Sequence, residues 1–376
     1  MKGPSLDMDC SQGRNPVRIR ASAQRGGPSV NLCSPGRQNV WMQENPGPNP
    51  PYGSQPPGPP VYPYAPPPVP QRRSWFLPTP HGVRFDHLAR TPANEPWRAI
   101  VGTIIVGIGF FVIGTGVLLV GKAVELILGL PAPSDPAQIF GDPVFGLVMV
   151  LLSIAAVLPL VFGTAALVQH RRPGTLSSVA GRLRWPWLLR CAGLAVLALL
   201  LGQIAQVAAL SMSGEEYSDL FGWVGWPRFL PALLVIVLLV PFQAATEEYI
   251  FRGWFVQAVG VHVRNPVWAI LIGSLLFASL HGYSWVGLLD VFAFGAVMGW
   301  LAVRTGGLEA PIALHVMNNM LAFGLSAASG SLEDALDQGK TPIPWQALSG
   351  TVVQLGVYAI GVLYLSKKRS VSTISG

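Results

Sequence analysis

Residues 229–257 read FLPALLVIVLLVPFQAATEEYIFRGWFVQ, an apolar run that carries three ionisable side chains, Glu247, Glu248 and Arg252. A helix needs about 17–25 mostly apolar residues to cross a bilayer, so this run predicts a membrane-spanning helix. Placing one ionisable side chain at the centre of such a helix costs about 2.5–3.5 kcal/mol on insertion scales. Residues that are retained against this cost indicate a functional site.

Similar apolar runs recur on both sides of this stretch, and together they predict an all-α, polytopic membrane helical bundle of about eight transmembrane helices over residues 97–370. The run from 266 to 280 is short, and the run from 229 to 257 is long. The predicted spans are Ala99–Gly121, Val144–Val168, Leu188–Ala209, Phe229–Gln257, Pro266–Leu280, Trp285–Val303, Leu308–Ala327 and Ala347–Leu365.

The composition supports a membrane protein, because 51% of the residues are hydrophobic and only 11% are charged. Soluble proteins carry about 25% charged residues. The net charge of +7 does not indicate nucleic-acid binding, since the basic residues form no continuous stripe with interleaved aromatic residues. Cys10, Cys33 and Cys191 have no spacing typical of a zinc site or a disulfide framework.

The charges between the apolar runs predict the orientation, because Lys and Arg mark the cytoplasmic side of a membrane protein. Basic residues precede the first run, follow every even-numbered run and end the chain, whereas acidic residues follow the third and seventh runs. We therefore expect both termini in the cytoplasm of a multi-pass protein of a bacterial plasma membrane. The basic residues concerned are Arg72, Arg73, Arg84, Arg90, Arg98, Arg171, Arg172, Arg182, Arg184, Arg264, Arg304, Lys367, Lys368 and Arg369.

Residues 1–96 form a Pro- and Gly-rich segment with a tract, PPYGSQPPGPPVYPYAPPPVP, at its centre. Such a segment cannot bury enough apolar area to offset its ordering entropy, so we predict a disordered cytoplasmic tail. A passive tether is favoured over a proline-rich ligand for another protein. The low-complexity tract begins just after Met42, which makes Met42 an alternative start of translation to Met1.

Helical spacing separates the roles of the three ionisable residues. Glu248 and Arg252 are four residues apart and can form an ion pair on one helix face. Glu247 lies about 100° away around the helix and has no cationic partner at helical spacing. We therefore interpret Glu248 and Arg252 as a structural ion pair and Glu247 as a free carboxylate available as a general base. The alternative is that all three anchor the helix end among lipid headgroups.

Two later runs carry further polar residues, His281 in FASLHG and His315 with Asn319 in LHVMNNM. His315 and Asn319 share one helix face, and Asn318 points elsewhere. A rise of 1.5 Å per residue places these three residues and Glu247 at ~12–22 Å from the cytoplasmic ends of their helices. We expect the four side chains to meet around one cavity inside the membrane.

Two other features of the sixth run have a plainer interpretation. Asp290 could line the same cavity, but the outer membrane interface is the favoured position. Gly295 and Gly299 form a GxxxG pair, and this spacing lets two helices approach closely, so we assign the pair to packing.

The three motifs resemble those of a known family, the type II CAAX-prenyl-protease and bacteriocin-processing proteases. EEYIFR is similar to the EExxxR motif of that family, FASLH to its FxxxH motif and HVMNN to its HxxxN motif, in the same order. The resemblance covers about Pro231 to Ala328, which places the protease-like core at about residues 229–328. It implies an intramembrane endopeptidase that acts on a membrane-associated protein or peptide.

The resemblance also implies roles for the residues at the matching positions. Glu247 and His281 would activate a water molecule, while His315 and Asn319 would stabilise the oxyanion of the tetrahedral intermediate. A zinc ion held by Glu247, His281 and His315 is the alternative; metal-free, glutamate-type chemistry is favoured because no dense ligand pair such as HExxH is present.

Two other functions stay open at this point. A membrane transporter would also place Glu and His inside the bilayer, although the inverted repeats typical of transporters are not seen. A catalytically inactive family member could act as a bacteriocin-immunity or binding factor. We do not expect this chain to share the specificity for CAAX substrates that the eukaryotic members of the family have.

Overall fold

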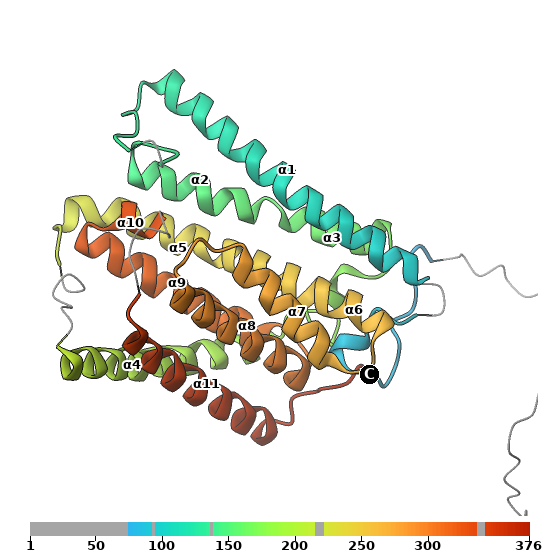
Figure 1. Cartoon of the computed structure of the whole chain (residues 1–376). Coiled ribbons are helices and arrows are strands. Elements are labelled where there is room, and N and C mark those ends of the chain that lie inside the picture. The colour runs from blue at the N-terminus through green and yellow to red at the C-terminus, as the bar shows by residue number, and fades with distance from the viewer. Residues whose placement is uncertain (1–73, 92–94, 136–137, 215–221, 337–342) are drawn as a thin grey trace, which may run out of the picture. The chain divides into compact units, whose positions relative to one another are not determined.

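The structure is a computed structural model that describes residues 74–91, 95–135, 138–214, 222–336 and 343–376. Within these ranges every named element is a helix, as the apolar runs predict (Figure 1). Of the predicted tail, residues 1–96, the part from residue 1 to residue 73, with Cys10, Cys33 and Met42, lies outside the described residues.

All eight predicted spans are helical. Seven segments of the described chain are long and apolar enough to cross a membrane, whereas α7 has only 14 residues. The helices are η1 (Phe85–His87), α1 (Pro96–Leu128), α2 (Pro143–Ala155), α3 (Leu158–Leu167), η2 (Pro173–Leu176), α4 (Trp185–Ser213), α5 (Trp226–Glu248), η4 (Tyr249–Phe255), α6 (Val256–His262), α7 (Pro266–Ser279), α8 (Trp285–Thr305), α9 (Glu309–Ser329), α10 (Leu332–Leu336), η5 (Trp345–Ala347) and α11 (Leu348–Lys368).

The second predicted span is not one continuous helix. It divides into α2 and α3 at Ala156 and Val157. Pro159 follows the break and has no N–H to donate to a carbonyl of the preceding turn, so it favours the start of a new helix over the continuation of the old one.

The fourth predicted span changes its helical form at the residues of the site. It runs from α5 through η4 to α6, and η4 is a π-helix over Tyr249–Phe255. π-Helical turns are rare and occur frequently at functional sites. Glu247 and Glu248 are the last two residues of α5, and Arg252 lies at the middle of the π-helix.

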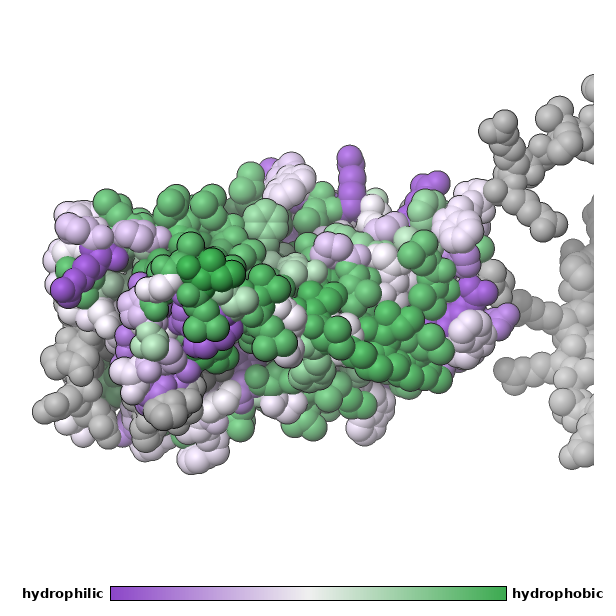
Figure 2. Space-filling view, turned by 90° about the horizontal axis from the view of Figure 1, so that it is seen from above, coloured by the Kyte–Doolittle hydropathy of each residue, from purple (hydrophilic) through white to green (hydrophobic). Residues whose placement is uncertain are grey.

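The outer surface of the bundle is apolar over the middle of the helices. Figure 2 shows hydrophobic side chains covering most of the middle of one face, with hydrophilic ones gathered towards both ends. Ile108, Val112 and Leu119 of α1, for example, are each at least 60% exposed. Such a belt fits a lipid environment, because an aqueous surface would carry far more charge.

One end of the bundle, which we call the arginine-rich end, carries most of the basic residues. Hydrogen bonds tie its segments together: Arg90 donates to the carbonyl of Val263 over 2.8 Å, and Arg98 donates to the carbonyl of Val168 over 2.9 Å. The basic residues of this end are Arg84, Arg90, Arg98, Arg171, Arg172, Arg182, Arg184, Arg190, Arg264, Arg304, Lys367, Lys368 and Arg369.

Two segments outside the long helices close the arginine-rich end. Residues 74–91 contain buried Phe85 and Leu88. Ser375, near the end of the chain, accepts a hydrogen bond from the backbone of Gly82 over 2.8 Å and donates to the carbonyl of Val83 over 2.9 Å. Residues 74–91, which the composition groups with the tail, thus pack on the helical domain.

A buried ion pair joins three further segments at this end. The guanidinium of Arg184, just before α4, donates to both carboxylate oxygens of Glu309 at the start of α9, over 2.8 and 2.7 Å. It also donates to the carbonyl of Thr305 over 3.0 Å and to that of Ser372 over 2.9 Å. We call this group of contacts the Arg184–Glu309 clamp.

Helices α7 and α8 approach closely at the GxxxG pair, as the spacing predicts. A Cβ atom at Gly299 would lie 3.1 Å from the side chain of Ile270, and one at Gly295 would lie 2.9 Å from Nη2 of Arg252. Glycine at position 295 therefore leaves room for the guanidinium of the EExxxR-like motif.

Candidate active site

A cavity of about 350 Å³ lies between α2, α5, α9 and α10, beside the turn that joins α7 to α8. It is lined by polar side chains along α5 and α9 and by apolar ones from α2. All four side chains that the sequence predicts to meet line this cavity. The lining residues are Val150, Leu151, Ile154, Gln243, Glu247, His281, Tyr283, His315, Asn318, Asn319, Ala322, Phe323, Ser326, Asp334, Ala335 and Ile343.

His315 lies between the two neighbouring carboxylates of α5. Its Nδ1 is 2.7 Å from Oε1 of Glu248, and its Nε2 is 3.2 Å from Oε2 of Glu247. Ionised carboxylates only accept hydrogen bonds, so both nitrogens of His315 carry hydrogen, with Nδ1–H directed at Glu248 and Nε2–H at Glu247. The imidazole is thereby fixed with Nε2 directed at Glu247.

Glu248 and Arg252 form an ion pair on the side of the site away from the cavity. Nη1 of Arg252 is 2.9 Å from Oε1 of Glu248, and both side chains are buried. The guanidinium also lies 4.3 Å from the ring centroid of Phe277. Within the described part of the chain, Oε2 of Glu248 and Nη2 of Arg252 have no hydrogen-bond partner.

His281 follows α7 and lines the cavity from the turn that leads to α8. Its Nδ1 lies 2.9 Å from the carbonyl oxygen of Phe277. A carbonyl accepts only, so Nδ1 is the protonated nitrogen, and Nε2 keeps a lone pair. The imidazole can therefore accept a proton or a hydrogen bond from a water molecule.

Asn319 of α9 is hydrogen-bonded to a side chain of α5 that also lines the cavity. Its Nδ2 donates to Oε1 of Gln243 over 3.1 Å. The amide keeps its second N–H, and Asn319 stands one helical turn beyond His315 on the same face of α9. The two residues thus offer hydrogen-bond donors along one wall of the cavity.

Five further polar residues of this cavity were not selected from the sequence: Gln243, Tyr283, Asn318, Ser326 and Asp334. Gln243 lies one turn before Glu247, and this helical spacing is a signal that could have indicated it. Tyr283 stacks on His281 with ring centroids 5.6 Å apart. Asn318 lines the cavity although it is 100° from Asn319 around the helix, because the cavity is wide enough to reach both; its Oδ1 also accepts from Gln354 over 3.2 Å.

The phenol of Tyr283 keeps its hydrogen in this position. Burial raises the pKa of Tyr283 above its ordinary value, and the carboxylates of Asp290 and Glu247 raise it further. Asp290 itself is hydrogen-bonded to Thr351 of α11 and is not among the described residues that line the cavity.

The residues proposed for a zinc ion do not form a ligand set. Among the residues that the structure describes, no three His, Cys, Asp or Glu side chains are placed to hold one metal ion. Glu247, His281 and His315 thus line one cavity without forming a three-ligand metal site among the described residues.

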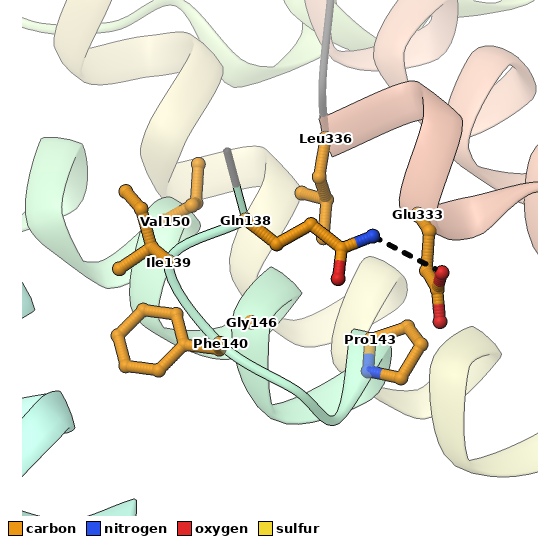
Figure 3. A pocket seen from close by; sticks show the side chains of 8 residues that line it. All are labelled: Gln138, Ile139, Phe140, Pro143, Gly146, Val150, Glu333 and Leu336. Carbon is orange, nitrogen blue, oxygen red and sulfur yellow. Dashed lines mark hydrogen bonds between the residues drawn. The ribbon is translucent and has the colours of Figure 1, made fainter. Parts of the chain in front are cut away.

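A second cavity, of about 110 Å³, lies where the start of α2 meets α10 (Figure 3). Nε2 of Gln138 donates to Oε2 of Glu333 across it, over 3.2 Å. Glu333 is the one ionisable side chain among its described lining residues. This cavity therefore lacks the paired acid and base groups of the larger one.

The comparisons with known proteins agree with the motifs. Residues 227–321 match the family model described as type II CAAX prenyl endopeptidase Rce1-like. This segment is similar to the Rce1-like family. It extends from the start of α5 into α9 and contains each predicted site residue, from Glu247 to Asn319.

Two curated bacterial proteins are similar to this chain. The uncharacterised protein YyaK of Bacillus subtilis (strain 168) is 29% identical over 155 residues, covering 38% of this chain and 52% of YyaK. An uncharacterised 24.3 kDa protein of Escherichia coli is 30% identical over 145 residues, covering 37% of this chain and 64% of the relative. The chain thus spans about half to two-thirds of the length of these relatives. No solved structure matches the chain.

Proposed function

We propose that the protein is an intramembrane endopeptidase that hydrolyses a peptide bond of a membrane-associated protein or peptide. The Rce1-like family is a family of endopeptidases, and the helices of this chain are long and apolar enough for a bilayer. The observation that carries the proposal is that Glu247, His281, His315 and Asn319 line one cavity.

Water activation is assigned to Glu247 and His281. A general base must lie within hydrogen-bond reach of the water that it deprotonates. Glu247 would take a proton from the water while Nε2 of His281 accepts the second hydrogen and fixes its direction. The water oxygen then forms a bond to the carbonyl carbon of the substrate, and the carbonyl oxygen becomes an oxyanion.

The oxyanion would be stabilised by His315 and Asn319. Before the reaction, Nε2 of His315 is directed at Glu247. Once Glu247 holds a proton, the N–H of His315 is released from it and can donate to the oxyanion together with the amide of Asn319. One such donor is worth about 2.7–4 kcal/mol in other hydrolases.

The second half of the reaction returns the proton. Glu247 would donate it to the amide nitrogen of the substrate, the C–N bond breaks, and a carboxylic acid and an amine leave. Glu248 and Arg252 do not touch the substrate in this scheme. They are positioning residues, because Glu248 holds the Nδ1–H of His315.

The proposal is tested by the substitution Glu247→Gln, which keeps size and hydrogen bonding but removes the basic carboxylate. New protein N-termini are mapped in membrane fractions of cells that express the wild type or the variant at equal levels. We expect a set of termini that depends on Glu247. Identical sets of termini would refute endopeptidase activity and leave a binding or immunity role.

Glu333→Gln serves as the matched control. Glu333 is an exposed carboxylate of α10 outside the larger cavity, and glutamine can keep its contact with Gln138. The set of termini should be the same for this variant and the wild type.

A further inference from the structure

The cavity extends along α9 in one direction only. His315, Asn319 and Ser326 line it in succession, and the eleven residues from His315 to Ser326 correspond to ~16 Å of helix. Ser326 lies in the last turn of α9, which ends at Ser329. The cavity therefore runs from the paired carboxylates to the end of α9 that leads into α10.

The opposite direction is closed by packing. All residues from Glu309 to His315 are buried. The Arg184–Glu309 clamp holds the first turn of α9, and the hydroxyl of Tyr358 donates to the carbonyl of Ala310 over 2.7 Å. No lining residue of the cavity that the structure describes comes from α9 before His315.

Residues of α10 form the rim of the cavity. Asp334 and Ala335 line it, and Asp334 is exposed. Short contacts place α10 at the end of the bundle opposite to the arginine-rich end: Gln138 before α2 reaches Glu333, and the N–H of Val224 before α5 donates to the carbonyl of Ala328 over 2.9 Å. Figure 1 shows α10 and the C-terminus at opposite ends of the molecule.

The two ends differ in charge. Nearly all described basic residues belong to the arginine-rich end, whereas the α10 end has basic residues only at Lys122 and Arg228 among the described ones. Lys122 is moreover paired with Glu125. Because Lys and Arg accumulate on the cytoplasmic side, this asymmetry favours the arginine-rich end as the cytoplasmic one.

From these observations we infer that the cavity opens to the extracytoplasmic side and takes peptide segments that lie on that side of the membrane. The inference rests on the proposed function for the cleavage step, but the direction of the opening does not depend on it. The substrate class is thus an extracytoplasmic segment next to a membrane anchor, and a cytoplasmic protein tail would not reach Glu247.

The lining of the cavity fits a peptide backbone. Gln243, Asn318 and Ser326 offer donors and acceptors along its length, and no Lys or Arg is among its described lining residues. An extended chain advances about 3.3 Å per residue, so about five residues would reach from Ser326 to His315. A substrate therefore needs an unfolded stretch of at least about this length on the outer side.

Cysteine labelling in intact cells tests the direction of the opening. The full-length protein is expressed in bacteria with Cys10 and Cys33 changed to Ser, and Cys191 is kept because it is buried. Asp334→Cys at the rim and Ser326→Cys inside the cavity are treated with a charged, membrane-impermeant maleimide. Thr373→Cys, an exposed position at the arginine-rich end, is the matched control.

We expect Asp334→Cys and Ser326→Cys to react in intact cells, and Thr373→Cys to react only after the membrane is permeabilised. Reaction of Asp334→Cys only after permeabilisation, or of Thr373→Cys in intact cells, would overturn the inference. If Ser326→Cys fails to react under either condition, the cavity is not open at this end. Labelling after denaturation shows that each variant is produced.

A second measurement separates this inference from the proposed function. Labelling is repeated with Glu247→Gln, and it should be unchanged because the opening does not require catalysis. The protein N-termini that depend on Glu247 should lie in extracytoplasmic segments. If no such termini are found, the proposed cleavage is contradicted, but the direction of the opening is not. If the termini lie in cytoplasmic segments, the direction of the opening is contradicted.

Discussion

Glu248 accepts a hydrogen bond from Nδ1 of His315 over 2.7 Å while its same oxygen receives Nη1 of Arg252 over 2.9 Å. One carboxylate oxygen of Glu248 thus links three helical segments: α5, which carries Glu248, the π-helix η4, which carries Arg252, and α9, which carries His315. In the proposed reaction its charge holds the Nδ1–H of His315 and thereby directs the Nε2–H at Glu247. The ion pair is therefore connected directly to the imidazole of His315.

The first prediction concerns the loss of one partner of this buried pair. Glu248→Ala or Arg252→Ala leaves the other charge unpaired in a region shielded from water, which costs about 3–5 kcal/mol for buried pairs. We expect a clear drop in melting temperature in detergent and a loss of cleavage. Glu333→Ala, which removes an exposed carboxylate, should leave the melting temperature nearly unchanged. Equal stability of Glu248→Ala and the wild type would contradict the role of the pair.

The second prediction is that Glu247→Gln abolishes cleavage but, unlike the ion-pair variants, does not lower the melting temperature. The amide keeps the size of the side chain and can still bond to Nε2 of His315, but it cannot take a proton from water. We expect cleavage to be abolished, with a melting temperature close to that of the wild type, measured by the same thermal melts. A large loss of stability would indicate that Glu247 holds the fold together, which the proposed role does not allow.

The third prediction concerns the hydroxyl group of Tyr283. Because the pKa of Tyr283 is raised, its hydroxyl keeps its hydrogen beyond the usual pKa of about 10 and can donate to a substrate at alkaline pH. If it does so in the transition state, Tyr283→Phe lowers kcat about a hundredfold. This factor should stay constant from about pH 7 to 9, since the group does not titrate there.

A matched variant separates the hydroxyl from the ring. Tyr283→Leu also removes the stacking on His281 and should lower activity further. An unchanged kcat for Tyr283→Phe would limit Tyr283 to a packing role. Tyr364→Phe, at an exposed position of α11, is the control and should leave kcat unchanged.

The fourth prediction concerns the room that Gly295 leaves for the guanidinium. A Cβ atom there would lie 2.9 Å from Nη2 of Arg252 and 3.1 Å from the side chain of Ser274. Overpacking of this kind costs about 1–3 kcal/mol, so Gly295→Ala should lower both the melting temperature and activity. Gly324→Ala on α9, where a Cβ atom meets nothing within 4 Å, is the control and should change neither. A Gly295→Ala variant with wild-type stability and activity would contradict the tight contact.

The sequence predicts the helices of this bundle well, because apolar runs of spanning length need no knowledge of their neighbours. It also selects four of the residues that line the cavity, since polar side chains stand out in apolar runs. The contact between Glu248 and His315 could not be predicted, because it joins α5 to α9 and depends on how these helices pack. The π-helix and the break at Ala156 likewise depend on local hydrogen bonding that hydropathy does not report.

The last prediction separates stability from chemistry at the arginine-rich end. Glu309 is fully buried and accepts two hydrogen bonds from the Arg184 guanidinium. Glu309→Ala leaves that cation without its carboxylate, so we expect a loss of about 3–5 kcal/mol, read as a lower melting temperature in detergent. Cleavage per folded molecule should not change, because the clamp lies at the closed end of α9, away from the cavity.

A double variant shows whether the lost stability comes from the unpaired charge. Replacing a buried ion pair by apolar residues is often neutral or stabilising, whereas removal of one partner is costly. Arg184→Leu combined with Glu309→Leu should therefore melt at a higher temperature than Glu309→Ala. A double variant that melts lower would mean that the contacts of Arg184 with the carbonyls of Thr305 and Ser372 stabilise this end more than the ion pair does, and the clamp would then act mainly through the backbone.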